Sequence, residues 1–350
     1  MGSGQKSQWA KAGGGGGQGL GGAGLVIPNP KLKLLDQVRE VMRLKHYSLR
    51  TERTYSDWIR RYIHFHRLKS RAELMVEAEQ KVELFLSDLA VHGQVAASTQ
   101  NQAFNALLFL YGQVLHRPLE NVQAVRADRP VRVPVVLTVD EVRQVLQTMT
   151  GTPQIVVKLL YGSGLRLMEA LRMRVQDVDM KMKQVTVRDG KGAKDRYTTL
   201  AEALIPVLHE HLQRVQLIHR EDLAAGGGGV YLPGALERKY PNAAREWRWQ
   251  YVFPARDLSK DPRSGQIRRH HVDEATINKA IKAAVARVGI QKSVSSHTFR
   301  HSFATHGLQG GADIRTIQEL LGHEDVSTTM IYTHVMGQGG CGMKSPLDSL

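Results

Sequence analysis

Four short patterns after residue 160 contain side chains that bind anions, transfer protons or act as nucleophiles. Guanidinium groups bind oxyanions through paired hydrogen bonds, ammonium and imidazole groups transfer protons, and a phenol can form a covalent intermediate. The patterns are Gly162-Ser163-Gly164-Leu165-Arg166, Gly190-Lys191-Gly192, Ser296-His297-Thr298-Phe299-Arg300, and Leu321-Gly322-His323 followed by Tyr332.

The third pattern places two of these side chains at the beginning of a predicted helix. Ser296 is the expected cap, and Phe299 and Phe303, four residues apart, would hold the helix on the core. His297 and Arg300 then share a face near the helix N-terminus. Free backbone N–H groups favour an anion such as phosphate at that end of a helix.

Each pattern taken alone also has a purely structural interpretation. Arg166 could be a solvated or salt-bridged side chain, and Lys191 could be an exposed lysine at a loop tip. Tyr332 could be a half-buried residue on an amphipathic helix. The order of the patterns therefore matters more than any one of them.

Metal and cofactor chemistry are not expected from this sequence. A zinc site at His297, His301 and His306 fits by spacing, but the glutamate of a metalloprotease motif is missing and Arg300 would place a cation beside the metal. Cys341 is the only cysteine, which excludes an intrachain disulfide and a cysteine-based metal site and fits a reducing cytoplasm. The chain has no Walker loop for a nucleotide.

The segments around the patterns predict a mixed, mainly α domain with a small antiparallel sheet. A capping box at 138–141 begins its first helix. Alternating residues on both sides of a glycine-rich turn predict a β-hairpin over 185–199, with Lys191 at its tip. A helical period over 314–321 ends at Gly322, a typical C-cap.

The whole chain is expected to divide into five parts. Eleven glycines between positions 2 and 24 predict a disordered leader over 1–29. Apolar residues at helical spacing predict an all-helical domain over 30–126, and two prolines predict an extended linker over 127–137. The second domain covers 138–336, and 337–350 form a tail. The fold class is therefore mainly α with a small antiparallel β-sheet.

The charge of the chain predicts a polyanionic partner. Lysine and arginine number 48 against 33 acidic residues, which gives a formal charge of +15. Nine basic residues between 43 and 71, interleaved with aromatic residues, form either a DNA-facing surface or a solvated helical face over an aromatic core. The DNA-contact candidates there are Arg43, Lys45 and Arg53. The sequence contains no run of eighteen apolar residues, so no membrane-spanning helix is predicted.

The four patterns, taken together and in order, resemble the full signature of the tyrosine recombinases of the phage-integrase type. The matching positions are Arg166, Lys191, His297-x-x-Arg300, Leu321-Gly322-His323 and Tyr332. The likeness runs from about Lys31 to the end of the chain. It implies a helical core-binding domain followed by a catalytic domain.

The resemblance implies a reaction in which DNA is cut and rejoined without hydrolysis. Tyr332 would attack a phosphodiester and form a 3′-phosphotyrosyl link, and Lys191 would protonate the departing 5′ oxygen. The free 5′ hydroxyl would then attack the link in a second strand. Because bond energy is conserved, no cofactor is implied.

The remaining signature residues would stabilise this reaction. By the same resemblance, Arg166 and Arg300 would hold the non-bridging oxygens of the phosphate, a task for which lysine is a poor substitute. His297 and His323 would donate hydrogen bonds and shuttle the attacking proton. Glu169 would orient a cationic side chain. The arginines would supply the charge that a metal supplies elsewhere.

Extra residues at about 221–271 resemble the insertion that marks the integron integrases. They lengthen the distance from Lys191 to His297 to 106 residues, more than in simple Xer-type members. Aromatic and basic side chains alternate there, as a reader of extruded bases requires, or else they form an aromatic mini-core that holds an inserted helix. Arg268-Arg269-His270-His271 would continue this base-stacking and phosphate-binding surface. The DNA-contact candidates are Lys239, Trp249, His270 and His271.

The two resemblances imply a substrate and an assembly. The substrates would be folded single-stranded attC-like sites and attI-like sites. The wider family resemblance implies a homotetramer on DNA, because recombination of two duplexes needs four active sites, in the bacterial cytoplasm at the nucleoid. The alternatives are an Xer-type or phage-type recombinase on duplex sites and a catalytically silent DNA-binding protein. A type IB topoisomerase shares the chemistry, but the insertion and the compact size favour recombination.

Overall fold

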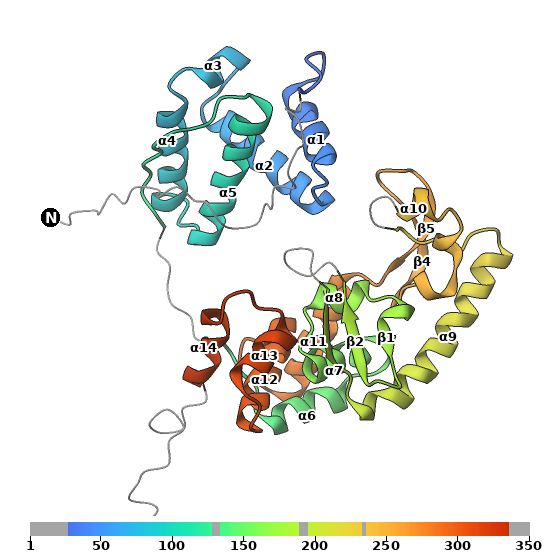
Figure 1. The fold of residues 1–350 in the computed structure, drawn as a ribbon. Helices are drawn as coiled ribbons and strands as arrows, with labels where there is room; N and C mark the ends of the chain where they lie inside the picture. The colour runs from blue at the N-terminus through green and yellow to red at the C-terminus, as the bar shows by residue number, and fades with distance from the viewer. Residues whose placement is uncertain (1–26, 128–133, 189–194, 233–235, 336–350) are drawn as a thin grey trace, which may run out of the picture. The chain divides into compact units, whose positions relative to one another are not determined.

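The computed structural model describes residues 27–127, 134–188, 195–232 and 236–335. The chain divides into two compact units, Met1–Val131 and Arg132–Leu350, each with a hydrophobic core of its own (Figure 1). No helix in these described ranges is long and apolar enough to cross a lipid bilayer.

The described elements of the first unit are all helical, as the sequence predicts. They are α1 (Leu34–Leu44), α2 (Leu49–Phe65), α3 (Arg71–Met75), α4 (Ala78–Val91) and α5 (Ala97–Phe109), followed by a π-helical turn at Leu110–Val114. Ser48 caps α2 by accepting a hydrogen bond from the backbone N–H of Thr51.

Two buried tyrosines connect the helices of this unit. The hydroxyl groups of Tyr62 on α2 and Tyr111 in the π-helical turn lie 2.9 Å apart, and that of Tyr111 donates to the carbonyl of Leu74 on α3 at 2.9 Å. Both side chains are fully buried, so these hydrogen bonds satisfy polar groups that would otherwise be costly to bury.

The second unit is mainly helical, with two small antiparallel sheets. Its helices are α6 (Val139–Thr148), α7 (Gly151–Ser163), α8 (Leu167–Arg172), α9 (Ile205–Ala224), α10 (Leu236–Lys239), α11 (Glu274–Val288), α12 (Ser296–Gln309), α13 (Ile314–Leu321) and α14 (Ser327–Val335). Its strands are β1 (Val178–Asp179), β2 (Gln184–Val187), β3 (Arg196–Thr199), β4 (Pro254–Lys260) and β5 (Ile267–His271). The predicted fold class is confirmed.

The first sheet contains the predicted hairpin. Its strands lie in the order β1-β2-β3, and β2 and β3 pair from Gln184 with Thr199 to Val187 with Arg196. The turn that carries Lys191 lies outside the described residues. Strands β4 and β5 form the second sheet, and their register shifts between Pro254 and Leu258.

Helix α12 is the central element of the second unit. It packs on α7 and contacts both α13 and α14, which lie beside it in Figure 1. Buried Phe299 anchors it in the main core. Its N-cap is Ser295, one residue earlier than predicted, because Ser295 keeps an extended backbone and donates its N–H to Thr298 Oγ1 at 3.0 Å. Ser296 is the first helical residue.

Two capping features were predicted correctly. Thr138 and Glu141 form a capping box at the start of α6. Gly322 ends α13 with a φ of +64°, in the left-handed region. Gly164 ends α7 in the same way, with a φ of +62°, and turns the chain into Arg166, which is the N-cap of α8.

We expect Gly164→Ala to lower the free energy of unfolding by about 3 kcal/mol, because it adds backbone strain and a steric clash. A Cβ at this position would lie 2.5 Å from ring carbons of Phe303. Gly289→Ala is the matched control, since Gly289 has a φ of +79° but open space around it. Its cost should be about 1 kcal/mol, from strain alone. Urea unfolding measures both; equal losses would show that the Phe303 contact is unimportant.

Candidate active site

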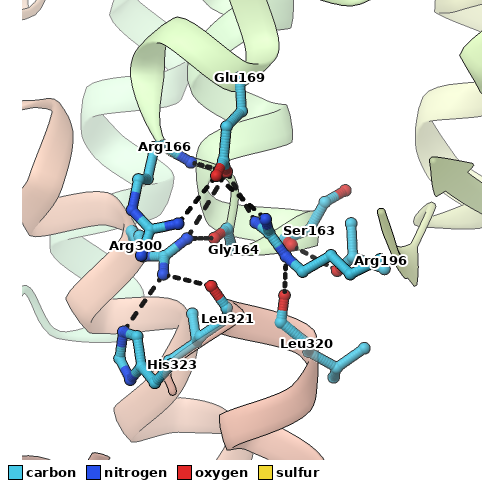
Figure 2. Close-up of polar contacts among 10 residues, drawn as sticks. Ser163, Gly164, Arg166, Glu169, Arg196, Arg300, Leu320, Leu321 and His323 are labelled. Atoms are coloured by element: carbon cyan, nitrogen blue, oxygen red, sulfur yellow. Dashed lines mark hydrogen bonds and ion pairs between the residues drawn. The ribbon is translucent and has the colours of Figure 1, made fainter. Parts of the chain in front are cut away.

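One carboxylate, that of Glu169 on α8, lies among three guanidinium groups (Figure 2). Its Oε1 accepts hydrogen bonds from Nη1 of Arg166 at 2.8 Å and from Nη1 of Arg196 at 3.0 Å. Its Oε2 accepts from Nη2 of Arg196 at 2.7 Å and lies 3.8 Å from Nη1 of Arg300. The carboxylate therefore joins the start of α8, the start of β3 and helix α12.

Arg300 is the most deeply buried of the three arginines, with 3% of its surface exposed. Its Nη1 donates to the carbonyl of Gly164 at 2.6 Å, and its Nη2 donates to the carbonyl of Leu321 at 2.6 Å. The guanidinium thus binds the C-terminal ends of α7 and α13 together. Burial and the positive charge of Arg166 lower the pKa of Arg300 to about 10, which leaves it protonated at neutral pH.

Arg196 is a site residue that the sequence analysis did not identify. Besides its two bonds to Glu169, its Nε donates to the carbonyl of Leu320 at 3.0 Å, and its side chain packs directly on Gly322. The available signal was its position in β3: it lies two residues before buried Thr198 and so on the same, inward face of the strand.

The charges of this cluster do not balance. One carboxylate faces three guanidinium groups, which leaves an excess of two positive charges. Burial by itself would raise the pKa of Glu169, but the hydrogen bonds and charge of Arg196, with those of Arg166, lower it to about 2. Glu169 is therefore ionised at neutral pH. The side chain of Arg166 is 32% exposed and offers its charge to an incoming anion such as phosphate.

His323 connects this cluster to Tyr332. Its Nε2 lies 3.2 Å from Nη2 of Arg300, and its Nδ1 lies 2.9 Å from Oγ1 of Thr329. Because a guanidinium only donates, Nε2 accepts, and the ring proton is on Nδ1. The ring of His323 is stacked on that of Tyr332, with centroids 6.3 Å apart.

Tyr332 is buried, with 2% of its surface exposed, rather than half-buried. Its hydroxyl lies 2.9 Å from Nδ1 of His301, a residue on α12 that was considered only as a zinc ligand. Burial raises the pKa of Tyr332, while the charges of Arg300 and Arg166 oppose that shift. The phenol is therefore protonated at neutral pH.

The histidines near Tyr332 are neutral at pH 7. Burial lowers the pKa of His301 to about 4 and that of His323 to about 4, and neighbouring positive charges contribute to both shifts. His297 is exposed at the start of α12, with its ring centroid 6.5 Å from that of His301. Although the residue is exposed, the protein around its ring removes part of the solvent from it, and this desolvation, together with the charges of Arg300 and Arg166, lowers the pKa of His297 as well.

The structure therefore brings together most of the expected residues. Arg166, Arg300, His323 and Tyr332 gather around or beside Glu169, and His297 lies at the margin. Among the described residues, no three or more histidine, cysteine or acidic side chains lie together as metal ligands would.

Two arginines of the extra segment are structural, against the expectation that they continue a phosphate-binding surface. Arg268 is buried and pairs with Glu237 at 2.6 Å, and Arg269 is buried and bonds to Asp222 at 2.8 Å. Adjacent residues of a strand point to opposite faces of the sheet. Arg268 therefore pairs with α10 on one face of β5, and Arg269 pairs with α9 on the other.

Two aromatic residues of the extra segment, Tyr251 and Trp249, pack in a small core, as one of the two interpretations predicts, whereas Tyr231 and Tyr240 are exposed. Tyr251 is buried, with the guanidinium carbon of Arg174 3.6 Å from its ring centroid. Trp249 is half-buried against the same cluster. Lys239 and His270 are exposed and His271 is half-buried. Their DNA contacts, and those of Trp249, stay predictions.

The candidate DNA contacts of the first unit differ in their surroundings. Arg43 is exposed, but its Nε and Nη2 bond to the buried carboxylate of Glu52 at 3.2 and 3.0 Å. Arg53 is exposed on α2, and Lys45 is half-buried after α1. Arg43 therefore has part of its charge balanced within the fold.

Comparisons with known proteins match both units. Residues 135–338 match the phage integrase family, and residues 34–121 match the phage integrase N-terminal SAM-like domain. An "Integrase/recombinase" of Escherichia coli is 50% identical over 324 residues, which cover 92% of this chain and 95% of that protein. "Tyrosine recombinase XerD" of Mycobacterium leprae is 34% identical over 263 residues, covering 70% and 72%.

Solved structures share the fold. The XerH site-specific recombinase bound to a palindromic difH substrate has a TM-score of 0.55 at 22% identity, and the match covers 87% of this chain and 82% of that one. The Tn1549 transposon integrase in complex with transposon right end DNA also has a TM-score of 0.55, at 14% identity.

We expect Glu169→Gln to lower the free energy of unfolding at pH 7 by about 3 kcal/mol, because the carboxyl pKa falls from 4.5 to about 2 on folding. A depressed pKa stabilises the fold above the unfolded value. The difference between the two proteins should therefore shrink as the pH falls from 4.5 towards 2. Urea unfolding at several pH values measures it. Glu202→Gln, at an exposed acid, is the control and should change little; a difference independent of pH would contradict this account.

Proposed function

Because the chain belongs to the phage integrase family of tyrosine site-specific recombinases, which cut and rejoin DNA, we propose that it acts through a covalent 3′-phosphotyrosyl intermediate at Tyr332. The observation that carries this proposal is the chain of contacts from the arginine cluster to the phenol. His323 accepts from Arg300 at 3.2 Å and stacks on the ring of Tyr332.

In the proposed reaction, Arg166 and Arg300 hold the non-bridging oxygens of the scissile phosphate. The cluster carries an excess of two positive charges around Glu169, and its low exposure keeps water from screening them. His297 lies at the exposed edge of the same cluster, where it would donate to a phosphate oxygen. His323 would donate to a phosphate oxygen in its other tautomer, in which Nε2 carries the ring proton and leaves Arg300, while Nδ1 accepts from the hydroxyl of Thr329.

Tyr332 attacks the phosphorus as the bond to the 5′ oxygen breaks. Lys191, in the turn between β2 and β3, protonates that oxygen. The support for Lys191 is its place in the signature and the position of Arg196, which follows the turn and bonds directly to Glu169. Rejoining reverses these steps with the 5′ hydroxyl of another strand.

The two units divide the work of binding and chemistry. We assign DNA binding to residues 30–126, with Arg43, Lys45 and Arg53 on its basic helices, and catalysis to residues 138–336. Residues 127–137 would join them. Exchange of strands between two duplexes needs four active sites, so the working form would be a homotetramer on DNA, with the tail 337–350 docked on a neighbour.

The substrate that we propose is an integron-type site, in which a folded single strand presents extrahelical bases. The support is the extra segment, where the side chains of Lys239 and His270 are exposed and Trp249 is half-buried against the small core around Tyr251. Exposed aromatic and basic groups suit base stacking and phosphate contacts. The 34% identity to a XerD recombinase favours a duplex site as the second candidate.

We expect wild-type protein to form a covalent adduct with a nicked suicide substrate in EDTA, because arginines and not a metal supply the positive charge. Tyr332→Phe removes the nucleophilic oxygen, so the adduct should disappear from a denaturing gel while DNA binding persists. Tyr197→Phe, at an exposed tyrosine on β3, is the matched control and should form the adduct normally. An adduct that survives Tyr332→Phe would exclude Tyr332 as the nucleophile.

Competition binding distinguishes the two substrates. We expect a bulged hairpin to bind more tightly than the same sequence as duplex, and His270→Ala to weaken hairpin binding about fivefold or more, the cost of one lost stacking contact. Duplex binding should be unaffected. His209→Ala, at an exposed histidine on α9, serves as control. Equal weakening on both DNAs would support the duplex-site alternative.

A further inference from the structure

The hydroxyl of Tyr332 already has a basic neighbour in the described structure. Nδ1 of His301 lies 2.9 Å from it, and the two ring centroids are 5.5 Å apart. His301 directly follows Arg300 on α12, whereas Tyr332 lies on α14. Arg300, which we propose binds the phosphate, and His301, which contacts the proposed nucleophile, are therefore adjacent residues on α12.

Tyr332 needs a proton acceptor within the protein. Only 2% of its surface is exposed, so its phenol proton has no direct route to bulk water. Its pKa is raised by burial, which means that the proton is present before attack. A phenol attacks a phosphate effectively only if it loses this proton as the new bond forms.

The other nearby groups are engaged elsewhere. Both ring nitrogens of His323 have partners, Arg300 and Thr329, and its ring lies face to face with that of Tyr332. The carboxylate of Glu169 is paired with Arg166, Arg196 and Arg300. His297 is exposed one turn before His301.

We infer that His301 is the general base that takes the phenol proton from Tyr332, an inference that rests on the recombinase function proposed above. The O–H bond of Tyr332 breaks as its oxygen bonds to phosphorus, and the proton moves to Nδ1 of a neutral His301. The bond from phosphorus to the 5′ oxygen breaks, and that oxygen takes a proton from Lys191. During rejoining, the His301 imidazolium returns its proton to Tyr332.

The surroundings of His301 keep it in the form that this role requires. The titratable and charged groups that face it are His297 and Arg300 on α12, Tyr332 on α14, and His323 from the segment between α13 and α14. Burial and the charges on α12 lower its pKa to about 4, so it is an uncharged acceptor at neutral pH. The imidazolium formed in the step is then balanced by the negative charge that develops on the phosphate.

The test measures single-turnover adduct formation on a nicked suicide substrate. Asparagine at position 301 keeps a hydrogen-bond acceptor near the place of Nδ1 but does not titrate. We expect His301→Asn to slow the adduct by about 10² to 10⁴-fold, the usual contribution of a general base. The wild-type rate should fall as the pH drops towards 4, and this fall should be absent in the variant.

A second variant separates proton transfer from positioning. His301→Ala should be rescued by imidazole in the buffer, at a rate that depends on the basicity of the imidazole used, which a purely structural role would not produce. Thermal unfolding and DNA binding check that both variants are folded. His306→Asn is the matched control, because His306 on the same helix contacts the hydroxyl of Tyr161, also at 2.9 Å, away from the arginine cluster.

The outcomes are distinct. A His301→Asn rate within threefold of wild type, or a slow His301→Ala that no imidazole restores, overturns the role of His301 as the base. A wild-type protein that forms no adduct contradicts the recombinase function itself, on which the inference rests. The role of His301 as the base is supported if both His301 variants are slow, imidazole restores the rate of His301→Ala, and His306→Asn reacts at the wild-type rate.

Discussion

The binding of three guanidinium groups by the single carboxylate of Glu169 is the interaction on which the site depends. Arg166 lies at the start of α8, Arg196 at the start of β3, and Arg300 on α12. Without the carboxylate between them, these three positive charges would repel one another. The carboxylate neutralises only one of the three charges. The other two positive charges are held in fixed positions, which suits the phosphate that we propose binds there.

Main-chain carbonyls extend this constraint to Tyr332, the proposed nucleophile. Arg300 and Arg196 donate to the carbonyls of Gly164, Leu321 and Leu320, at the ends of α7 and α13, where helix carbonyls lack partners of their own. These ends are formed by left-handed glycines. The same arginines thus fix the segment that carries His323 and leads into α14, so the arginine cluster and Tyr332 are positioned by one set of contacts.

The extra segment between α9 and α11 shows how residue type alone misleads about exposure. Arg268 and Arg269 are basic residues in a DNA-binding protein, yet both are buried in ion pairs that hold β5 to α10 and α9. The exposed basic side chains that remain for the proposed DNA contacts include Lys239 and His270.

The sequence by itself determined the helical first unit, the hairpin, the caps at Thr138 and Gly322, and the candidate residues Arg166, Arg300, His323 and Tyr332. These depend on local periodicity, turn chemistry and the order of short patterns. Only the tertiary structure decided that Arg196 binds Glu169, 27 residues away, that His301 contacts Tyr332, 31 residues away, and that Arg269 pairs with Asp222, 47 residues away. The physical reason is that the partner of a long polar side chain is chosen by which elements pack together, and no local pattern records that choice.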